Sequence, residues 1–467
     1  MLDDALALAS AIRNRKMSAL EAMEASIVAV RDYSHLGAVV RMDADRGRTQ
    51  AMRLDRGPGG GAFGGVPFLV KDLGGPFEGW PVSAGSRALQ GAPEASVEAA
   101  DGNFAHRLRA TGLCIFGMTS VPEFGLSLAT DPTLGAPCMN PLAPHLTAGG
   151  SSGGAAAAVA QGIVPIAHAT DAGGSIRVPA ACCGLVGLKP SRGAVASGPG
   201  VENHLCGLAT ELVVCRSIRD AEAAFESVRT NLGRHERAAL GSQVAPDQVR
   251  IGLLTDTGDE TPTCYNYLVA AQDAARALEH NGHSVADVSW AQLGPLARAS
   301  GDVFASIVCV NLAELFSSGA LDASKTEPIT QVAIEAGLAM SGTDLLASQN
   351  SIVHTAHRLC HMFETMDCIV APMLAKPPPP IGSFPMDSRD INAHFSAMAA
   401  FSPTACLANV SGFSALTLPF GEDADGLPLP VQLIAPVGGE GLLFALAKRL
   451  ESEGRWHHRF AVRALAA

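Results

Sequence analysis

The segment best suited to chemistry is a stretch of glycine, alanine and serine at residues 148–190, which contains two Gly-Gly-Ser steps. In the second step, Gly173 and Gly174 permit a tight turn directly before Ser175. A hydroxyl at such a turn lies beside free backbone N–H groups, which can stabilise the negative oxygen that forms when a carbonyl is attacked. Ser175 is therefore a candidate nucleophile, and the backbone N–H groups from Ala172 to Ser175 are a candidate oxyanion hole.

A base must accompany this serine, because a hydroxyl is a weak nucleophile until its proton is removed. The usual base is a histidine oriented by an acid. His145 and His168 are close in sequence, but neither has the strand-top spacing of a G-x-S-x-G elbow, so we do not expect a Ser-His-Asp arrangement. Close packing of small residues is the alternative that the composition leaves open. If Ser175 reacts, a different base is needed.

Several motifs give the chain a resemblance to the amidase signature family. The order of these motifs, and the spacing between Ser151 and Ser175, fit that family. Together they extend the likeness over nearly the whole chain. The motifs are GVPFLVKD at 65–72, GGSSGG at 149–154, DAGGSIRVPA at 171–180, GLVGLKPSRG at 184–193, and the closing segments NVSGFSALTLPFG and GLPLPVQ.

The resemblance implies a Ser-Ser-Lys triad, in which Ser175 forms an acyl-enzyme, Ser151 bridges and Lys71 is the base. Lys71 can act as a base only when neutral, and the pKa of a solvated lysine is about 10.4, so burial must lower it substantially. The apolar residues VPFLV before Lys71 provide such a setting. The resemblance also implies a cis peptide bond between Gly150 and Ser151. No metal or organic cofactor is required.

Neighbouring residues are expected to support the triad. Asp171 and Arg177 resemble a structural pair that braces the loop of the nucleophile. Ser152 is expected to cap the alanine-rich helix that follows it, and Thr170 is a further supporting residue.

The implied function is that of a serine amidohydrolase acting on the C–N bond of a small, largely uncharged linear or cyclic amide. LVGLKPSRG, the SGPG step and TELVVCRSIRD bring the chain nearest to cyclic-dimer hydrolases of the 6-aminohexanoate type. One alternative is the A subunit of a tRNA-dependent amidotransferase, but those subunits carry an acid where this chain has Gly439, before Glu440. The other is an inactive binding scaffold, which the complete triad disfavours. Ala155 and Ala172 depart from the usual family residues, and these departures are expected to affect pocket shape or loop bracing.

The elements that position these residues are short buried strands alternating with helical segments. This alternation predicts an α/β fold, and the resemblance implies a mixed, mostly parallel central β-sheet covered by α-helices on both faces. The predicted strands are VPFLV, LCIFG, VPIAHA, LVGLK, RIGLLTD, DCIVAP, SALTLPF and LPVQLIA.

We expect residues 1–467 to form a single amidase signature domain. Residues 1–60 are expected to form an N-terminal helical hairpin packed on it, with Ser18 and Glu21 as a capping box at the second helix. A soft internal boundary is expected near residues 227–248, where charged and polar residues increase.

The substrate pocket is expected to involve Gly125 and Leu126, which precede Ser151, and the mostly helical segment 290–366. One helix in that segment places three histidines on one face. That face could bind a transition metal, but no second ligand cluster accompanies it, so we predict no metal site and favour a lid over the pocket. The three histidines are His354, His357 and His361.

The overall composition limits the classes of partner and the cellular location that we expect. A formal net charge of −12 argues against nucleic acid. The acidic N-terminus does not resemble a secretion signal, and no uninterrupted apolar run reaches about 18 residues, so we expect no membrane span. Eleven scattered cysteines favour reduced thiols and a cytoplasmic location. The expected partner is a small-molecule amide, and apolar helices would make a homodimer unsurprising.

Overall fold

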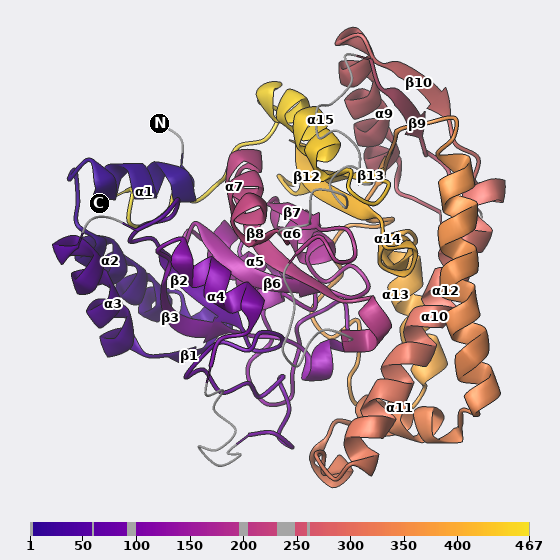
Figure 1. The fold of residues 1–467 in the computed structure, drawn as a ribbon, viewed down its shortest axis with the longest axis horizontal. Helices are drawn as coiled ribbons and strands as arrows, with labels where there is room; N and C mark the ends of the chain where they lie inside the picture. Colours follow the sequence, from indigo (N-terminus) through magenta and orange to yellow (C-terminus); the bar gives the residue numbers. More distant parts are fainter. Residues whose placement is uncertain are drawn as a thin grey trace.

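The computed structural model describes residues 3–57, 60–90, 100–195, 204–230, 248–258 and 262–466. A sheet of eleven strands runs through these residues (Figure 1). In spatial order its strands are β1 (Val39–Met42), β3 (Cys114–Thr119), β2 (Pro67–Lys71), β6 (Ile166–Asp171), β8 (Thr210–Cys215), β7 (Val186–Lys189), β12 (Ser414–Glu422), β13 (Pro428–Ala435), β11 (Cys368–Pro372), β9 (Arg250–Leu253) and β10 (Ser284–Asp287). A separate pair consists of β4 (Met139–Asn140) and β5 (Ala143–Thr147).

The pairing of the strands is mixed. Strands β3, β2 and β6 are parallel to one another, as are β11, β9 and β10. The strands between these groups pair antiparallel, and so does β1 with β3. The predicted mixed α/β sheet is confirmed, but parallel pairing is less extensive than expected, because β12 and β13 form a hairpin closed by a short turn and β8 runs against both of its neighbours.

Helices cover both faces of this sheet (Figure 1). α4, α7, α15 and α9 contact one another in that order, whereas α5 and α6 contact each other and the central strands. The helices are α1 (Ala5–Arg13), α2 (Ala19–Asp32), α3 (Ala44–Arg56), α4 (Asn103–Ala110), α5 (Gly153–Ala160), α6 (Arg177–Cys183), α7 (Ile218–Val228), α9 (Tyr265–His280), α10 (Trp290–Ser317), α11 (Pro328–Ala339), α12 (Gly342–Met362), α13 (Ile391–Phe401), α14 (Ala405–Ser411) and α15 (Glu440–Ser452).

The N-terminal segment contains more than two helices. Helix α2 begins at the predicted capping box, in which the Ser18 hydroxyl accepts from the Glu21 amide and the Glu21 carboxylate accepts from the Ser18 amide. After α1 and α2 the chain adds β1 to the edge of the sheet, and α3 then packs on β3. The segment is therefore joined to the sheet by backbone pairing as well as by helix packing.

Close packing explains the small residues of α5. Every residue of this helix is buried. A Cβ atom at Gly154 would lie 2.4 Å from the backbone nitrogen of Ser120 and 2.6 Å from the carbonyl oxygen of Ala38. Glycine there lets α5 approach the end of β3, and this approach fixes the residues that lead into the helix, including Ser151. Small residues in this segment thus serve both packing and the site.

Within the described residues, α10 is the one helix long and apolar enough to cross a membrane by length and composition. Of its most apolar 18-residue window, 44% is buried. The helix contacts α11, α12 and α14, as expected for a core helix of a globular protein, which passes the same test (Figure 1). Length and composition are therefore weak evidence for a span, and the absence of one stays a prediction.

Candidate active site

The side chain of Lys71, at the end of β2, is fully buried and reaches two hydroxyl groups. Its Nζ atom lies 2.8 Å from Ser151 Oγ and 2.7 Å from Thr170 Oγ1. Burial lowers the pKa of Lys71 to about 7, although the carboxylates of Asp171 and Glu211 act in the opposite direction. A neutral amine within hydrogen-bond distance of Ser151 can accept its proton.

The backbone around Ser151 agrees with the sequence prediction. The Gly150–Ser151 peptide bond is cis. A Cβ atom at Gly150 would lie 2.6 Å from the carbonyl oxygen of Ser127, so only glycine fits before the cis bond. Ser152 differs from its prediction, because its side chain does not cap α5. Its hydroxyl instead lies 3.3 Å from the carbonyl oxygen and 3.4 Å from the amide nitrogen of Thr170, linking the start of α5 to β6.

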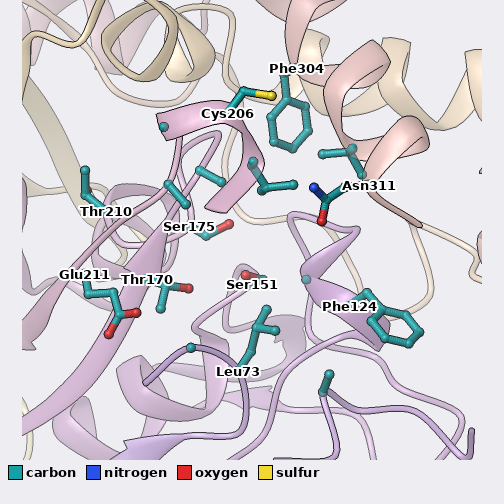
Figure 2. A pocket seen from close by; sticks show the side chains of 18 of the residues that line it. Leu73, Phe124, Ser151, Thr170, Ser175, Cys206, Thr210, Glu211, Phe304 and Asn311 are labelled. Atoms are coloured by element: carbon teal, nitrogen blue, oxygen red, sulfur yellow. The ribbon is translucent and has the colours of Figure 1, made fainter. Parts of the chain in front are cut away.

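Ser175 lies in the turn between β6 and α6 and faces the same cavity as Ser151 (Figure 2). It is 7% exposed. Its hydroxyl makes no hydrogen bond to any other described residue, whereas Ser151 is held by Lys71. The structure thus joins two members of the predicted triad by a hydrogen bond and places the third at the same cavity. Catalytic hydrogen bonds often tighten only when substrate is bound.

The turn offers three free backbone donors rather than the predicted four. The amide of Gly174 donates to Asp171 Oδ1 at 2.8 Å. It is therefore directed at the carboxylate and not at the cavity. Among the described residues, the amides of Ala172, Gly173 and Ser175 have no acceptor, so these three are available as oxyanion-hole donors.

Asp171 and Arg177 form a fully buried ion pair that holds this turn. Arg177 Nε and Nη2 each lie 2.9 Å from one oxygen of Asp171. Burial alone would raise the pKa of Asp171, but the charge of Arg177 and hydrogen bonds from Arg177 and Asn409 bring it well below its ordinary value. Arg177 also donates to Gln432 and Asn409. The predicted bracing pair is thus part of a larger buried network, and its two added members belong to the closing motifs of the sequence.

A second brace acts on the backbone of Lys71. The Lys71 amide donates to His168 Nδ1 at 3.2 Å, so His168 Nε2 carries the proton and donates to Glu211 Oε2 at 3.0 Å. Glu211 Oε1 also accepts from the amide of Gly75. His168 is therefore a buried core residue that holds β2, β6 and β8 together, whereas His145 is exposed on β5. Sequence analysis assigned no role to Glu211, although this residue lies in the segment TELVVCRSIRD.

The cavity around the two serines has a volume of about 550 Å³ and mostly apolar walls. Gly125 lines it, as predicted. Leu126 does not, because its side chain is buried in the core and its carbonyl oxygen accepts from His394 Nε2 at 2.8 Å. Lining residues that the sequence did not single out are Leu73, Gly74, Val82, Ala84, Leu89, Phe104, Phe124, Arg192, Gly193, Val195, Leu205, Cys206, Gly207, Ala209, Thr210, Glu211, Phe304, Val308, Asn311, Leu312 and Leu315.

Helix α10 supplies one wall of the cavity. Phe304 packs on the oxyanion turn so closely that a Cβ atom at Gly173 would lie 2.8 Å from the ring. Helix α12 contributes no lining residue, so the expected lid is not formed by its histidines. His354, His357 and His361 are exposed on α12. In the described part of the chain, no group of three or more His, Cys, Asp and Glu side chains could hold a metal ion.

Comparison with known proteins places this geometry in a family. The profile of the amidase family matches residues 21–444. The chain belongs to the amidase family. This amidase is 32% identical to the 6-aminohexanoate-cyclic-dimer hydrolase of Paenarthrobacter ureafaciens, over 97% of its own chain and 95% of the relative. The predicted family and amidohydrolase class, acting on C–N bonds other than peptide bonds, are confirmed.

Solved structures agree with the assignment. A 6-aminohexanoate cyclic dimer hydrolase complexed with substrate matches the amidase with a TM-score of 0.87 and 29% identity, covering 99% of each chain. A bacterial aryl acylamidase of the amidase signature family matches with a TM-score of 0.83 and 25% identity, covering 99% of this chain and 98% of the other. The predicted nearness to cyclic-dimer hydrolases is confirmed, although the SGPG step used for it, at 197–200, lies outside the described residues.

Proposed function

We propose that this chain hydrolyses a small, largely uncharged linear or cyclic amide through an acyl-enzyme on Ser175. The observation that carries the proposal is the fully buried Lys71, whose Nζ lies 2.8 Å from Ser151 Oγ at the cavity that Ser175 also lines. No other described lysine combines burial, a hydroxyl partner and a cavity.

In the first half-reaction, neutral Lys71 accepts the proton of Ser151 as Ser151 accepts that of Ser175. The Ser175 oxygen then adds to the amide carbonyl, and the free turn amides stabilise the oxyanion. The relay returns the proton to the departing amine when the C–N bond breaks. In the second half-reaction, water attacks the acyl-enzyme and gives its proton to the same relay. The relay returns that proton to Ser175 Oγ as the ester bond breaks and the carboxylic acid leaves.

The cavity limits the substrate. Its walls are built mainly of leucine, valine and phenylalanine side chains, which favours an apolar acyl or amine group. Its two charged lining groups already have partners: Arg192 donates to the carbonyl oxygens of Gly207, Asn409 and Val410, and Glu211 is held by His168 and Gly75. We therefore infer that the substrate is uncharged. Within segment 290–366, helix α10 is the part that shapes the pocket for it. The cyclic dimer of 6-aminohexanoate, which the relative named above acts on, is the first compound to assay.

The proposal is tested by intact mass after incubation with a sulfonyl fluoride. Wild type should gain one adduct, and Ser175→Ala should gain none, because only an activated serine is sulfonylated. Asn409 and Gln432 hold the turn in both proteins, so the circular dichroism of the variant should be unchanged. An unlabelled wild type with no activity on amides would favour the inactive scaffold instead.

The cellular location, the partners and the oligomeric state of the enzyme are also proposals. We infer a cytoplasmic hydrolase, with no nucleic-acid partner, that forms a homodimer. The exposed apolar side chains of Leu338 on α11 and of Leu346 and Val353 on α12 support association. Sedimentation should give twice the mass of the chain, and a monomer at all concentrations would contradict the dimer.

A further inference from the structure

Helix α12 presents three histidines to solvent, and the proposed reaction uses none of them. The helix packs on α10 and α14 and lies at the outer edge of the molecule (Figure 1). Of its residues, only Thr355 and Leu359 are buried. His354, His357 and His361 are exposed, and none of them lines the catalytic cavity. The outer face of α12 is therefore accessible to a ligand or a partner.

His357 and His361 have the spacing of a chelating pair. Residues four positions apart in a helix lie one turn apart on the same face, with about 5–6 Å between their Cβ atoms. Two histidines with this spacing bind zinc from a single helix in the H-E-x-x-H motif. Imidazole is a suitable ligand for Zn²⁺, and a zinc ion held by protein side chains alone takes four ligands. Helix α12 thus offers half of a closed zinc site.

A carboxylate already orients one of these two rings. His361 Nδ1 lies 3.2 Å from an oxygen of Glu364, just after the end of α12. Because a carboxylate only accepts, Nδ1 carries the proton, and Nε2 of the neutral ring has a free lone pair. Histidines that bind zinc commonly donate their other N–H group to a carboxylate in this way. His357 has no partner among the described residues, so its ring is also available. The contact with Glu364 is an observation independent of the spacing, and it too indicates a metal ligand.

The other two ligands must come from outside the chain. Within the part of the chain that the structure describes, no group of three or more His, Cys, Asp and Glu side chains could hold a metal ion, so α12 does not complete the site alone. A twofold axis places the same surface of a second copy opposite itself. A second copy therefore supplies a second pair of histidines, facing the first.

The apolar side chains beside the histidines favour the same partner. Val353 lies four residues before His357, and Leu346 lies two turns before Val353, so both share the face of the histidines. Each of these two apolar residues is more than half exposed. A stable dimer buries about 800 Å² on each partner, far more than two side chains provide. A dimer formed through α12 therefore needs a further attachment, and a shared zinc ion would provide it.

We propose that two copies of this chain bind one zinc ion between them, through His357 and His361 of each α12. The inference rests on the homodimer proposed above and states what joins its two halves. Each helix supplies two imidazole nitrogens, so the ion has the four ligands of a closed structural site. The site takes no part in hydrolysis, because α12 contributes no residue to the catalytic cavity.

Sedimentation of the full chain tests the zinc bridge. Removing metal with a chelator should weaken dimerisation at least about tenfold, and zinc chloride should restore it, with one ion bound per two chains. In His357→Ala and in His361→Ala, zinc should not strengthen dimerisation. The matched control is His145→Ala, which removes an exposed histidine from β5 and should respond to zinc as wild type does. Circular dichroism checks that all three variants are folded.

A milder variant and three contrary outcomes complete the test. Glu364→Gln keeps both histidines but loses the charge that orients His361, so the affinity for zinc should fall about tenfold and dimerisation should return at higher zinc concentration. A dimer of equal strength in chelator and in zinc would overturn the zinc bridge and leave the dimer itself standing. Zinc bound to monomers, one ion per chain, would overturn the shared site. A monomer under all conditions would overturn both the dimer and this inference. None of these outcomes depends on Ser175, so a failure of the amidase proposal would appear separately, in the adduct assay.

Discussion

Lys71 and Lys189 are both fully buried, and burial lowers the pKa of each to about 7. Their partners differ. Lys71 reaches the hydroxyl groups of Ser151 and Thr170 beside the cavity, whereas Lys189, on β7, donates to the carbonyl oxygen of Pro190 at 2.6 Å and lines no part of the cavity. Both lie near the Asp171–Arg177 pair, whose charges act on the pKa of Lys189 in opposite directions.

The comparison shows that a lowered pKa does not by itself make a lysine catalytic. Burial gives both amines access to the neutral state near pH 7. Only at Lys71 does the amine meet a hydroxyl that can pass on a proton, next to space for a substrate. At Lys189 the amine meets a carbonyl oxygen, which has no proton to give. A buried lysine is therefore expected to act as a base only where its amine contacts a hydroxyl group beside a cavity. A lowered pKa is necessary for this role but not sufficient.

The largest expected difference is in turnover. Lys71→Ala should lower kcat by several orders of magnitude, about a thousandfold or more, because the relay loses its base. The amide assay is steady-state hydrolysis, with circular dichroism as the check on folding. A variant that keeps most of the activity would exclude Lys71 as the base.

Lys189→Met should affect stability rather than turnover. Methionine keeps the length and apolar stem, but the carbonyl oxygen of Pro190 loses its donor, so the free energy of unfolding should fall by about 1–3 kcal/mol. The measurement is urea unfolding, and kcat/KM of the folded variant should stay within about tenfold of wild type. A loss of turnover as large as that of Lys71→Ala, in a protein of unchanged stability, would contradict the view that Lys189 takes no part in catalysis.

The pH profile should locate the working lysine. Lys71 is active when neutral and its pKa in the folded protein is about 7, so kcat/KM should be constant above pH 7. It should fall about tenfold per pH unit below it, as the amine becomes protonated. The fall in kcat/KM below pH 7 reports the protonation of Lys71 together with the two serines that share its proton. A limb in the range of an ordinary carboxylate would show that another group controls the rate.

Glu211→Gln should give the smallest effect. Its carboxylate raises the pKa of Lys71, so removing the charge should move the acid limb to lower pH by less than about one unit. Glutamine can still accept from the Gly75 amide. The matched control is Glu440→Gln, since Glu440 raises the pKa of Lys189 and not that of Lys71. The Glu440→Gln variant should keep the acid limb of the pH profile at the wild-type pH. A shift of the limb in both variants would show that the effect is not local.

Short motifs that resemble those of the amidase signature family predicted the site residues, and local patterns predicted the helix cap and several strands. The triad, the cis bond before Ser151 and the strand that ends at Lys71 each lie within short motifs. Ser18 and Glu21 form the expected capping box because a cap is a local structure. Apolar runs with β-branched residues likewise marked β2, β3, β6 and β7.

Other features depend on contacts between distant segments and left no local signal. The wall formed by Phe304 and Asn311 follows from the packing of α10 beside the turn of Ser175, far away in sequence. Leu126 was expected at the pocket, but its side chain is buried in the core and its carbonyl oxygen accepts from His394 on α13. The number of free donors in the turn depends on the Asp171 carboxylate, which accepts from the Gly174 amide and is held in place by Arg177.

The contact between Gly173 and Phe304 has a consequence for engineering this enzyme. The Phe304 ring of the cavity wall packs directly on Gly173, in the turn that we propose stabilises the oxyanion. A library that varies position 304 would therefore alter the catalytic turn together with the pocket, and its members would lose rate for reasons unrelated to fit. Val308, Leu312 and Leu315 line the same wall, and none of them supplies the atoms nearest to Gly173, so we expect that substrate range can be varied at these three positions while the aromatic ring stays fixed.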